Sequence, residues 1–172
     1  MRPSADRVSA LPAVSVVDLE RLLDELAASS IECVLVGGLA ARLRGAPVYT
    51  EDVDVVYSLS DDNVARAARW LTSIDARFVA RSELAPNLSD LKSRGHKLLM
   101  TPWGRLDFLG AAGADRDYEG FVADAAPFGP PESELSIASL KTVILLKEEA
   151  DRPKDRAVLP LLRSVLKQSE LA

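Results

Sequence analysis

The sequence predicts an α/β or α+β domain in which helices pack on a mixed β-sheet. Helical periodicity and short Val-rich runs alternate in the first half of the chain. Two apolar runs on either side of Pro102-Trp103-Gly104 are typical of a β-hairpin. The remaining C-terminal part has helical patterns, so a mixed sheet flanked by helices, with a helical C-terminal segment, is expected.

The length of the chain favours a single domain. Its 172 residues, 48% of them hydrophobic, suffice for one well-packed core and not for two. Residues 1–15 are rich in Ala, Ser and Pro without a clear period, and they are expected to form a loose N-terminal arm. Residues 16–172 are then the domain, which ends in a helix pair over about 138–168.

The elements of the first half follow from apolar spacing and from turn residues. Asp18 stands where a helix dipole favours a negative charge, and Gly45-Ala46-Pro47 breaks the second helix. Helices are expected over 17–28 and 39–44, and a third helix is expected to begin within 60–63 and to end at 71. Strands are expected over 31–36 and from Thr50 to Tyr57.

The second half is expected to contain fewer strands and more turns. Gly129-Pro130-Pro131 interrupts one strand, and the Asp151-Arg152-Pro153 corner separates the last two helices. We expect strands over 76–80, 96–101, 105–109 and 122–128, a loop or one turn over 86–90, turns or a brief helix over 110–120, and helices over 139–150 and 154–168.

Two acidic residues lie in a Val-rich segment, where strands normally avoid Asp. Asp52 and Asp54 are two positions apart, so their side chains lie on the same face of a strand. Adjacent carboxylates repel each other unless a cation lies between them. A few hard oxygen ligands with room for water and phosphate suit Mg²⁺ better than Zn²⁺ or Ca²⁺. The pair predicts a magnesium site; the alternative is a solvated pair at a strand end.

A glycine pair and a third acidic residue complete the candidate site. Gly37 and Gly38 end an apolar strand and open a helix whose free N–H groups are expected to hold a phosphate. Asp107 lies in the second hairpin strand, which we expect to pair beside the Asp52 strand so that the carboxylates converge. Two alternatives stay open: an ordinary strand-to-helix turn at the glycines, and an exposed ion pair between Asp107 and Arg105.

The ordered set of Gly37-Gly38, Asp52-x-Asp54 and Asp107 resembles the pattern of the DNA polymerase beta-type nucleotidyltransferase superfamily. Residues 137–155 are similar to the C-terminal helices of small bacterial minimal nucleotidyltransferases and of the abortive-infection-type toxin–antitoxin group. In those proteins a Lys and an Arg-x-Lys-Asp segment come near the nucleotide. The matches span residues 31–166, and they imply the nucleotidyltransferase fold.

The resemblance implies a two-metal transfer of a nucleoside monophosphate from a triphosphate, with ATP expected, to a hydroxyl of a protein, a tRNA or a small molecule. Asp52 and Asp54 would hold the Mg²⁺ that grips the triphosphate. Asp107 would complete the second metal site and help to activate the acceptor hydroxyl. The same match assigns phosphate or nucleotide contacts to Gly37, Gly38, Lys147, Arg152 and Asp155, with Lys141 as the substitute for Lys147.

Two departures from the family pattern leave other functions open. Residues 45–50 lack the Arg that some relatives carry shortly before the Thr, and residues 156–159 offer no further acidic group. A second hypothesis is therefore a catalytically silent protein of this fold that binds a partner, such as one half of a toxin–antitoxin pair. A third is a metal-binding domain without nucleotide. Arg152 and Asp155 could also simply pair across the interhelical corner.

Charge and hydropathy limit the partners. The net charge of −5 argues against bulk nucleic-acid binding, because such affinity comes from Lys and Arg. No apolar run approaches the ~20 residues that cross a bilayer, and no signal peptide is recognised, so a cytoplasmic protein without a membrane partner is expected. Six basic residues in two groups could still face a phosphorylated ligand: Arg42, Arg44, Lys92, Arg94, Lys97 and Arg105.

Four single residues are expected to be structural. Cys33 lies in an apolar run and is expected to be a buried small hydrophobe. His96 is expected to be structural, since the expected chemistry does not require a histidine. Trp70 and Trp103 are expected to pack rather than to stack on a base.

Overall fold

One mixed β-sheet organises the computed structural model, which describes residues 17–172; the arm expected over residues 1–15 lies outside the described residues. The strands are hydrogen-bonded in the order β3-β4-β5-β2-β1-β7-β6. Their bounds are β1 Cys33–Val36, β2 Asp52–Tyr57, β3 Arg77–Phe78, β4 His96–Thr101, β5 Gly104–Leu109, β6 Ala126–Pro127 and β7 Leu135–Ile137. Parallel and antiparallel pairs alternate through the middle of the sheet, which confirms the predicted fold class.

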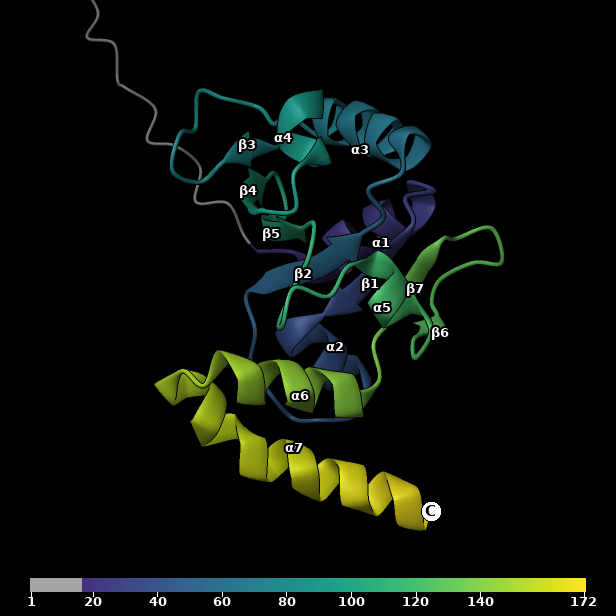
Figure 1. The fold of residues 1–172 in the computed structure, drawn as a ribbon, viewed down its shortest axis with the longest axis vertical. Helices are drawn as coiled ribbons and strands as arrows, with labels where there is room; N and C mark the ends of the chain where they lie inside the picture. The colour runs from purple at the N-terminus through teal and green to yellow at the C-terminus, as the bar shows by residue number, and fades with distance from the viewer. Residues whose placement is uncertain (1–16) are drawn as a thin grey trace, which may run out of the picture.

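Seven helices flank the sheet within the described part of the chain. Their bounds are α1 Leu19–Ala28, α2 Gly37–Leu43, α3 Asp61–Ser73, α4 Leu88–Lys92, α5 Tyr118–Val122, α6 Leu140–Ala150 and α7 Pro153–Leu171. Helices α6 and α7 lie together at one end of the molecule, and α3 and α4 lie at the other (Figure 1). Over residues 17–172, no helix combines the length and the apolar character needed to cross a membrane.

The register between neighbouring strands positions the acidic residues. Strand β5 runs parallel to β2, and this pairing sets Asp107 beside Asp54 and Arg105 beside Asp52. On the other side of β2, the antiparallel strand β1 sets Val36 beside Asp54. Because β1 ends at Val36, the glycine that follows lies next to the carboxylate of Asp54.

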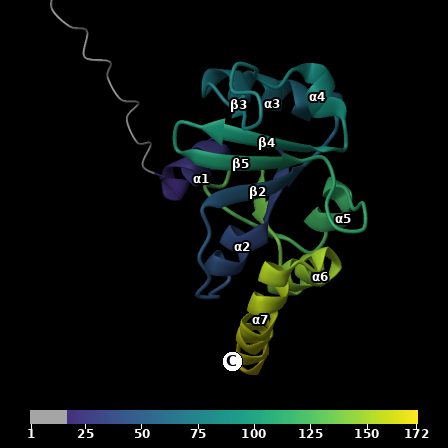
Figure 2. The ribbon, with the colours of Figure 1, turned by 90° about the vertical axis from the view of Figure 1, so that its left-hand side faces the viewer.

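Core residues lie on both faces of the sheet, and an aromatic pair packs on the face opposite the acidic residues. The rings of Tyr57 and Phe108 stack with their centroids 4.1 Å apart, and the Tyr57 hydroxyl donates to the Leu91 carbonyl at 2.6 Å. In β4, buried and exposed residues alternate strictly, as expected for a strand with one covered face. Figure 2 shows β2, β5 and β4 side by side, with no helix in front of β4 and β5.

Side-chain caps explain where several helices begin. Asp18, expected near a helix start, accepts from the Arg21 backbone N–H at 2.9 Å. Ser60 and Ser139 cap α3 and α6 in the same way. Asn87 and Asp90 form a reciprocal capping box, so the segment expected to be a loop or one turn over 86–90 begins a short helix at Leu88.

The expected strand over 122–128 is wrong, because Asp117 caps α5 and its helix continues to Val122. Only Ala126–Pro127 is strand there. Strand β7 was not predicted, since three residues are too few for a period to show. The strand expected over 76–80 shortens to two residues.

Asn63 joins α3 to the ends of β1 and β2. Its side-chain carbonyl accepts from the Glu32 N–H at 2.8 Å, and its amide donates to the Glu32 and Ser58 carbonyls at 3.1 and 2.8 Å. Asn63 is fully buried, and its loss removes the Asn63 partner of the Glu32 N–H and of the Ser58 carbonyl, whereas the Glu32 carbonyl keeps the Ser58 N–H at 3.0 Å.

We therefore expect Asn63→Ala to lower the free energy of unfolding by about 2–4 kcal/mol. Urea denaturation followed by circular dichroism measures this change. Ser73→Ala, which removes one exposed hydrogen bond from the same helix, is the matched control and should cost less than about 1 kcal/mol. Equal losses in the two variants would contradict the role given to Asn63.

Candidate functional site

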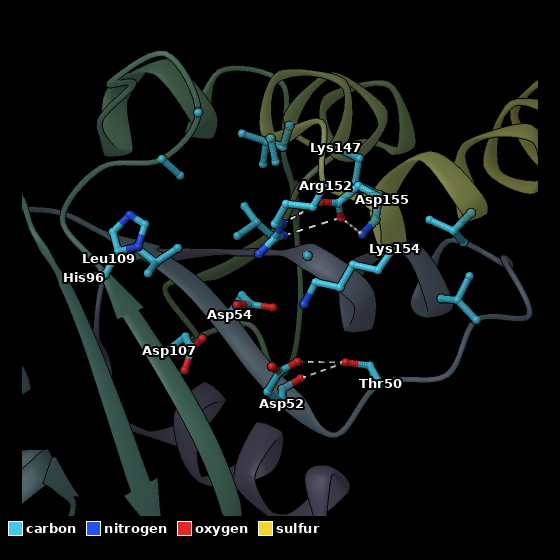
Figure 3. Close-up of a pocket in the computed structure, with 18 of the residues that line it drawn as sticks. Thr50, Asp52, Asp54, His96, Asp107, Leu109, Lys147, Arg152, Lys154 and Asp155 are labelled. Atoms are coloured by element: carbon cyan, nitrogen blue, oxygen red, sulfur yellow. Dashed lines mark hydrogen bonds and ion pairs between the residues drawn. The ribbon is translucent and has the colours of Figure 1, made fainter. Parts of the chain in front are cut away.

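A cavity of about 730 Å³ opens between the sheet and the α6–α7 corner. Strands β2 and β5 form its floor, and residues from the start of α2, from loop 48–51, from α6 and from α7 form its walls. Figure 3 shows acidic side chains on the floor and basic side chains reaching toward them from the two C-terminal helices. The cavity therefore combines segments that are far apart in the sequence.

Three aspartates meet on the floor of this cavity. One carboxylate oxygen from each of Asp52, Asp54 and Asp107 lies within 4.8 Å of the other two. Thr50 donates its hydroxyl to Asp52 at 3.0 Å, and the Arg105 guanidinium contacts Asp107 at 3.2 Å. The strand pairing expected from the sequence brings the three together, and the ion pair weighed as the alternative for Asp107 is present as well.

Burial and mutual repulsion make it unfavourable for all three aspartates to be ionised when no cation is bound. Burial, followed by the nearby charges of Asp52 and Asp107, raises the pKa of Asp54 to about 7, although Lys147 and Arg105 oppose the rise. Burial also raises the pKa of Asp107, against the hydrogen bond and the charge of Arg105. Three hard oxygen donors that destabilise one another in this way could hold a divalent cation.

The glycine pair is required by close packing at the carboxylates. Gly37 has a φ of +68°, and a Cβ atom on it would lie 2.2 Å from Oδ2 of Asp54. A Cβ atom on Gly38 would lie 2.9 Å from Oγ1 of Thr50. The two glycines thus make room for the acidic floor. Helix α2, which begins at Gly37, has only seven residues, so it adds little to the field at the site.

Asp155 forms ion pairs with two of the basic residues that are predicted to contact the nucleotide. It is fully buried, and it contacts Nζ of Lys147 at 3.2 Å and Nε of Arg152 at 2.6 Å. Burial would raise the pKa of Asp155, but the hydrogen bonds and charges of Arg152 and Lys147 outweigh it and lower the pKa. Asp155 therefore faces the two cations, and Lys147 and Arg152 line the cavity.

Several further residues line the cavity without having been assigned to the site from the sequence, among them Thr50, His96 and Lys154. Arg105, considered from the sequence as a possible contact to a phosphorylated ligand, lines it as well. Lys154 extends from α7 toward Asp54, and the His96 ring lies at the far wall beside Leu109 (Figure 3). The signal that could have found Lys154 is its place inside the Arg-x-Lys-Asp segment. His96 is exposed and lines the wall, so its expected structural role is not visible in the packing.

Most of the basic residues considered as ligand contacts lie elsewhere. Arg44 donates to the Ile137 and Ala138 carbonyls at 2.7 and 3.0 Å. The Lys97 ammonium donates to the Ser93 and Gly95 carbonyls. Lys92 and Arg94 pair with Asp61 and with Asp115 and Asp117. Lys141, the substitute for Lys147, pairs with Glu170.

The expected packing of Cys33 is confirmed, since it is fully buried and burial raises the pKa of its thiol. Trp70 and Trp103 are partly buried against the core, and the Arg21 guanidinium lies 5.8 Å from the centre of the Trp103 ring. Neither tryptophan lines the cavity.

Comparisons with known proteins bear on the fold. The chain matches no protein-family model and no curated protein. It is similar to the crystal structure of a provisionally named nucleotidyltransferase from Thermotoga maritima, with a TM-score of 0.52 and 14% sequence identity. The similarity covers 92% of this chain and 99% of the other. At this level of identity it shows that the chain has a nucleotidyltransferase-like fold.

Proposed function

We propose that this protein is a metal-dependent nucleotidyltransferase that transfers a nucleoside monophosphate from a triphosphate to a hydroxyl. The observation that carries the proposal is the convergence of Asp52, Asp54 and Asp107 on the floor of a cavity whose α6–α7 wall carries basic residues. Acidic groups attract a divalent cation, and the basic groups of that wall attract phosphate. The nucleotidyltransferase-like fold supports the same conclusion.

The aspartates fit Mg²⁺ in charge and in donor type. Asp52 and Asp54 would hold it, with Asp107 completing a second metal position, and the cation would offset the cost of an ionised carboxylate at Asp54. A bound cation supplies charge stabilisation to the phosphate oxygens during displacement at the α-phosphorus. Thr50 fixes the orientation of Asp52 through its hydroxyl.

The basic side chains on the α6–α7 wall of the cavity would bind the phosphates. Lys147 and Arg152 are held in place by Asp155, and each retains donors that Asp155 does not use. Lys154 reaches into the cavity from the same corner, and no acidic partner is found for it among residues 17–172 (Figure 3). We assign Lys154 as a phosphate contact, in place of the Arg that residues 45–50 lack. A cavity of about 730 Å³ accommodates a nucleoside triphosphate, ATP by our proposal.

Asp107 is placed to serve the acceptor. It lies on the β5 side of the cluster, and its raised pKa favours uptake of a proton. In the transfer step the acceptor oxygen forms a bond to the α-phosphorus and its proton passes to the Asp107 carboxylate. The bond from the α-phosphorus to the bridging oxygen breaks, and pyrophosphate leaves with the electron pair.

One observation favours a second function. Asp155 neutralises charge on both Lys147 and Arg152, which weakens the attraction that these residues exert on a triphosphate. A catalytically silent protein that binds a partner, as in a toxin–antitoxin pair, would tolerate this arrangement. Nucleotide binding without turnover, together with a tight complex with a partner protein, would distinguish it from the enzyme.

Mg²⁺ should stabilise the protein through Asp54. Because the folded-state pKa of Asp54 lies above its unfolded value, the contribution of Asp54 to stability falls as the pH rises from about 4 to about 7. Without metal at pH 8, Asp54→Asn should therefore raise the melting temperature by about 3 °C or more. Added Mg²⁺ should raise the melting temperature of the wild-type protein and leave that of the variant almost unchanged.

Differential scanning fluorimetry from pH 5 to pH 8, with and without Mg²⁺, measures both effects. Asp24→Asn, which removes an exposed carboxylate from α1, is the control and should show neither. If Mg²⁺ stabilises Asp54→Asn as strongly as the wild-type protein, the assignment of the metal site is wrong.

Substitutions at Asp107 and Lys154 should affect different properties: the transfer rate at Asp107 and the affinity for ATP at Lys154. Asp107→Asn should lower transfer of label from α-³²P-ATP by about 100-fold or more, because it removes the proton acceptor. Lys154→Ala should instead raise the dissociation constant for ATP by about tenfold, the loss of one charge-assisted hydrogen bond. Calorimetry measures the binding, and Lys167→Ala on the exposed surface of α7 is the control. Absence of ATP binding by the wild-type protein in Mg²⁺ would exclude the enzyme.

A further inference from the structure

The sheet face that carries the metal cluster continues beyond Asp107 onto β4. In one row across the strands, Asp54 pairs with Asp107 and Asp107 pairs with Leu98. In the next row, Asp52 pairs with Arg105 and Arg105 pairs with Met100. Neighbouring strands are about 4.8 Å apart, so Leu98 begins one strand spacing from the carboxylate assigned to the acceptor.

This continuation is apolar and open. Val79 donates its backbone N–H to the Leu98 carbonyl at 2.9 Å, which extends the first row onto the edge of the sheet. Val79, Leu98 and Met100 are 44%, 41% and 46% exposed, and we call them the apolar strip. No helix lies in front of β4 in Figure 2, and the described residues leave these side chains open to solvent.

Most of the cations beside the apolar strip are paired with acidic residues, and Arg81, two residues beyond Val79, instead lies over the ring of Phe78 at 5.5 Å. Arg77 lies on β3, opposite Met100 of β4, and it contacts Asp75 at 2.5 Å. Arg105 contacts Asp107, and Arg94 contacts Asp115 and Asp117. The side chain of Lys97 lies on the opposite, buried face of β4. A polyanionic acceptor would thus find little free positive charge along this path, whereas an apolar segment would find a matching surface.

We propose that the acceptor is a polypeptide, which docks an apolar segment on Val79, Leu98 and Met100 and directs a Ser, Thr or Tyr hydroxyl to Asp107. The inference rests on the proposed function, and it names the class of acceptor for that site. A neutral, apolar approach to an acidic cluster suits a peptide hydroxyl. It does not suit the phosphate backbone of RNA, in agreement with the net charge of −5.

Binding of defined probes tests the proposal without requiring turnover. Fluorescence anisotropy is measured for labelled peptides with a central Ser, Thr or Tyr flanked by Leu and Val, and for the same peptides flanked by Glu. The third probe is a single-stranded RNA oligonucleotide with a free 3′ hydroxyl. Each is titrated with the full chain in Mg²⁺, without nucleotide and again with a non-transferable ATP analogue. The Leu/Val peptides should bind at least about tenfold more tightly than the other two probes.

The variant Leu98→Gln/Met100→Gln should weaken binding of the Leu/Val peptides by about tenfold. Its ATP affinity should not change, because neither residue lines the cavity. Leu161→Gln, at 38% exposure on α7, is the matched control and should bind the peptides normally. Circular dichroism verifies that the variants are folded.

Each other outcome overturns the proposal: no peptide binding, equal binding of both peptide types, tighter binding of RNA, or unchanged peptide binding by the double variant. Failure of the proposed function gives a different result. In that case ATP does not bind to the wild-type protein, while the dependence of peptide binding on Leu98 and Met100 remains.

Discussion

The mutual repulsion of three carboxylates is the constraint around which the structure is organised. Parallel pairing of β2 with β5 puts Asp54 directly beside Asp107, and the alternation of side chains puts Asp52 on the same face. Like charges at this separation oppose folding unless a cation binds or a proton is retained, and the raised pKa of Asp54 shows the second solution. The protein keeps this unfavourable cluster on a well-packed sheet, which is typical of sites selected for binding.

The surrounding charges compensate the cluster only in part. Arg105 contacts Asp107 from the solvent side, while Lys147 and Arg152 approach from the α6–α7 corner. Asp155 fixes the two corner cations, and it also reduces their net charge. The result is a cavity with negative charge at the floor and positive charge at the wall, an arrangement that suits a metal ion bound to phosphate better than either ion alone.

The sequence predicted the features that depend on local pattern. The alternation of Asp52 and Asp54, the hairpin around Trp103 and the helix start near Asp18 are all local, and each was confirmed. The convergence of Asp107 with the other two depended on one assumed strand pairing, which the resemblance supported. The short strand β7 could not be predicted, because pairing with β1 decides it. The structure of residues 122–128 could not be predicted either, because it depends on the helix that Asp117 caps. Lys154 lies inside the Arg-x-Lys-Asp segment, but its own role was not assigned, because the fold of the α6–α7 corner decides which way its side chain points.

The guanidinium of Arg44 ties the end of α2 to the segment just before α6. Its two hydrogen bonds go to consecutive backbone carbonyls at the end of β7, so the wall of the cavity is anchored to the same sheet that forms the floor. This link reduces the freedom of the wall to move relative to the floor, so less conformational entropy would be lost if a ligand entered between them. A ligand of the proposed kind would then meet a surface whose shape is set largely by the backbone of the sheet.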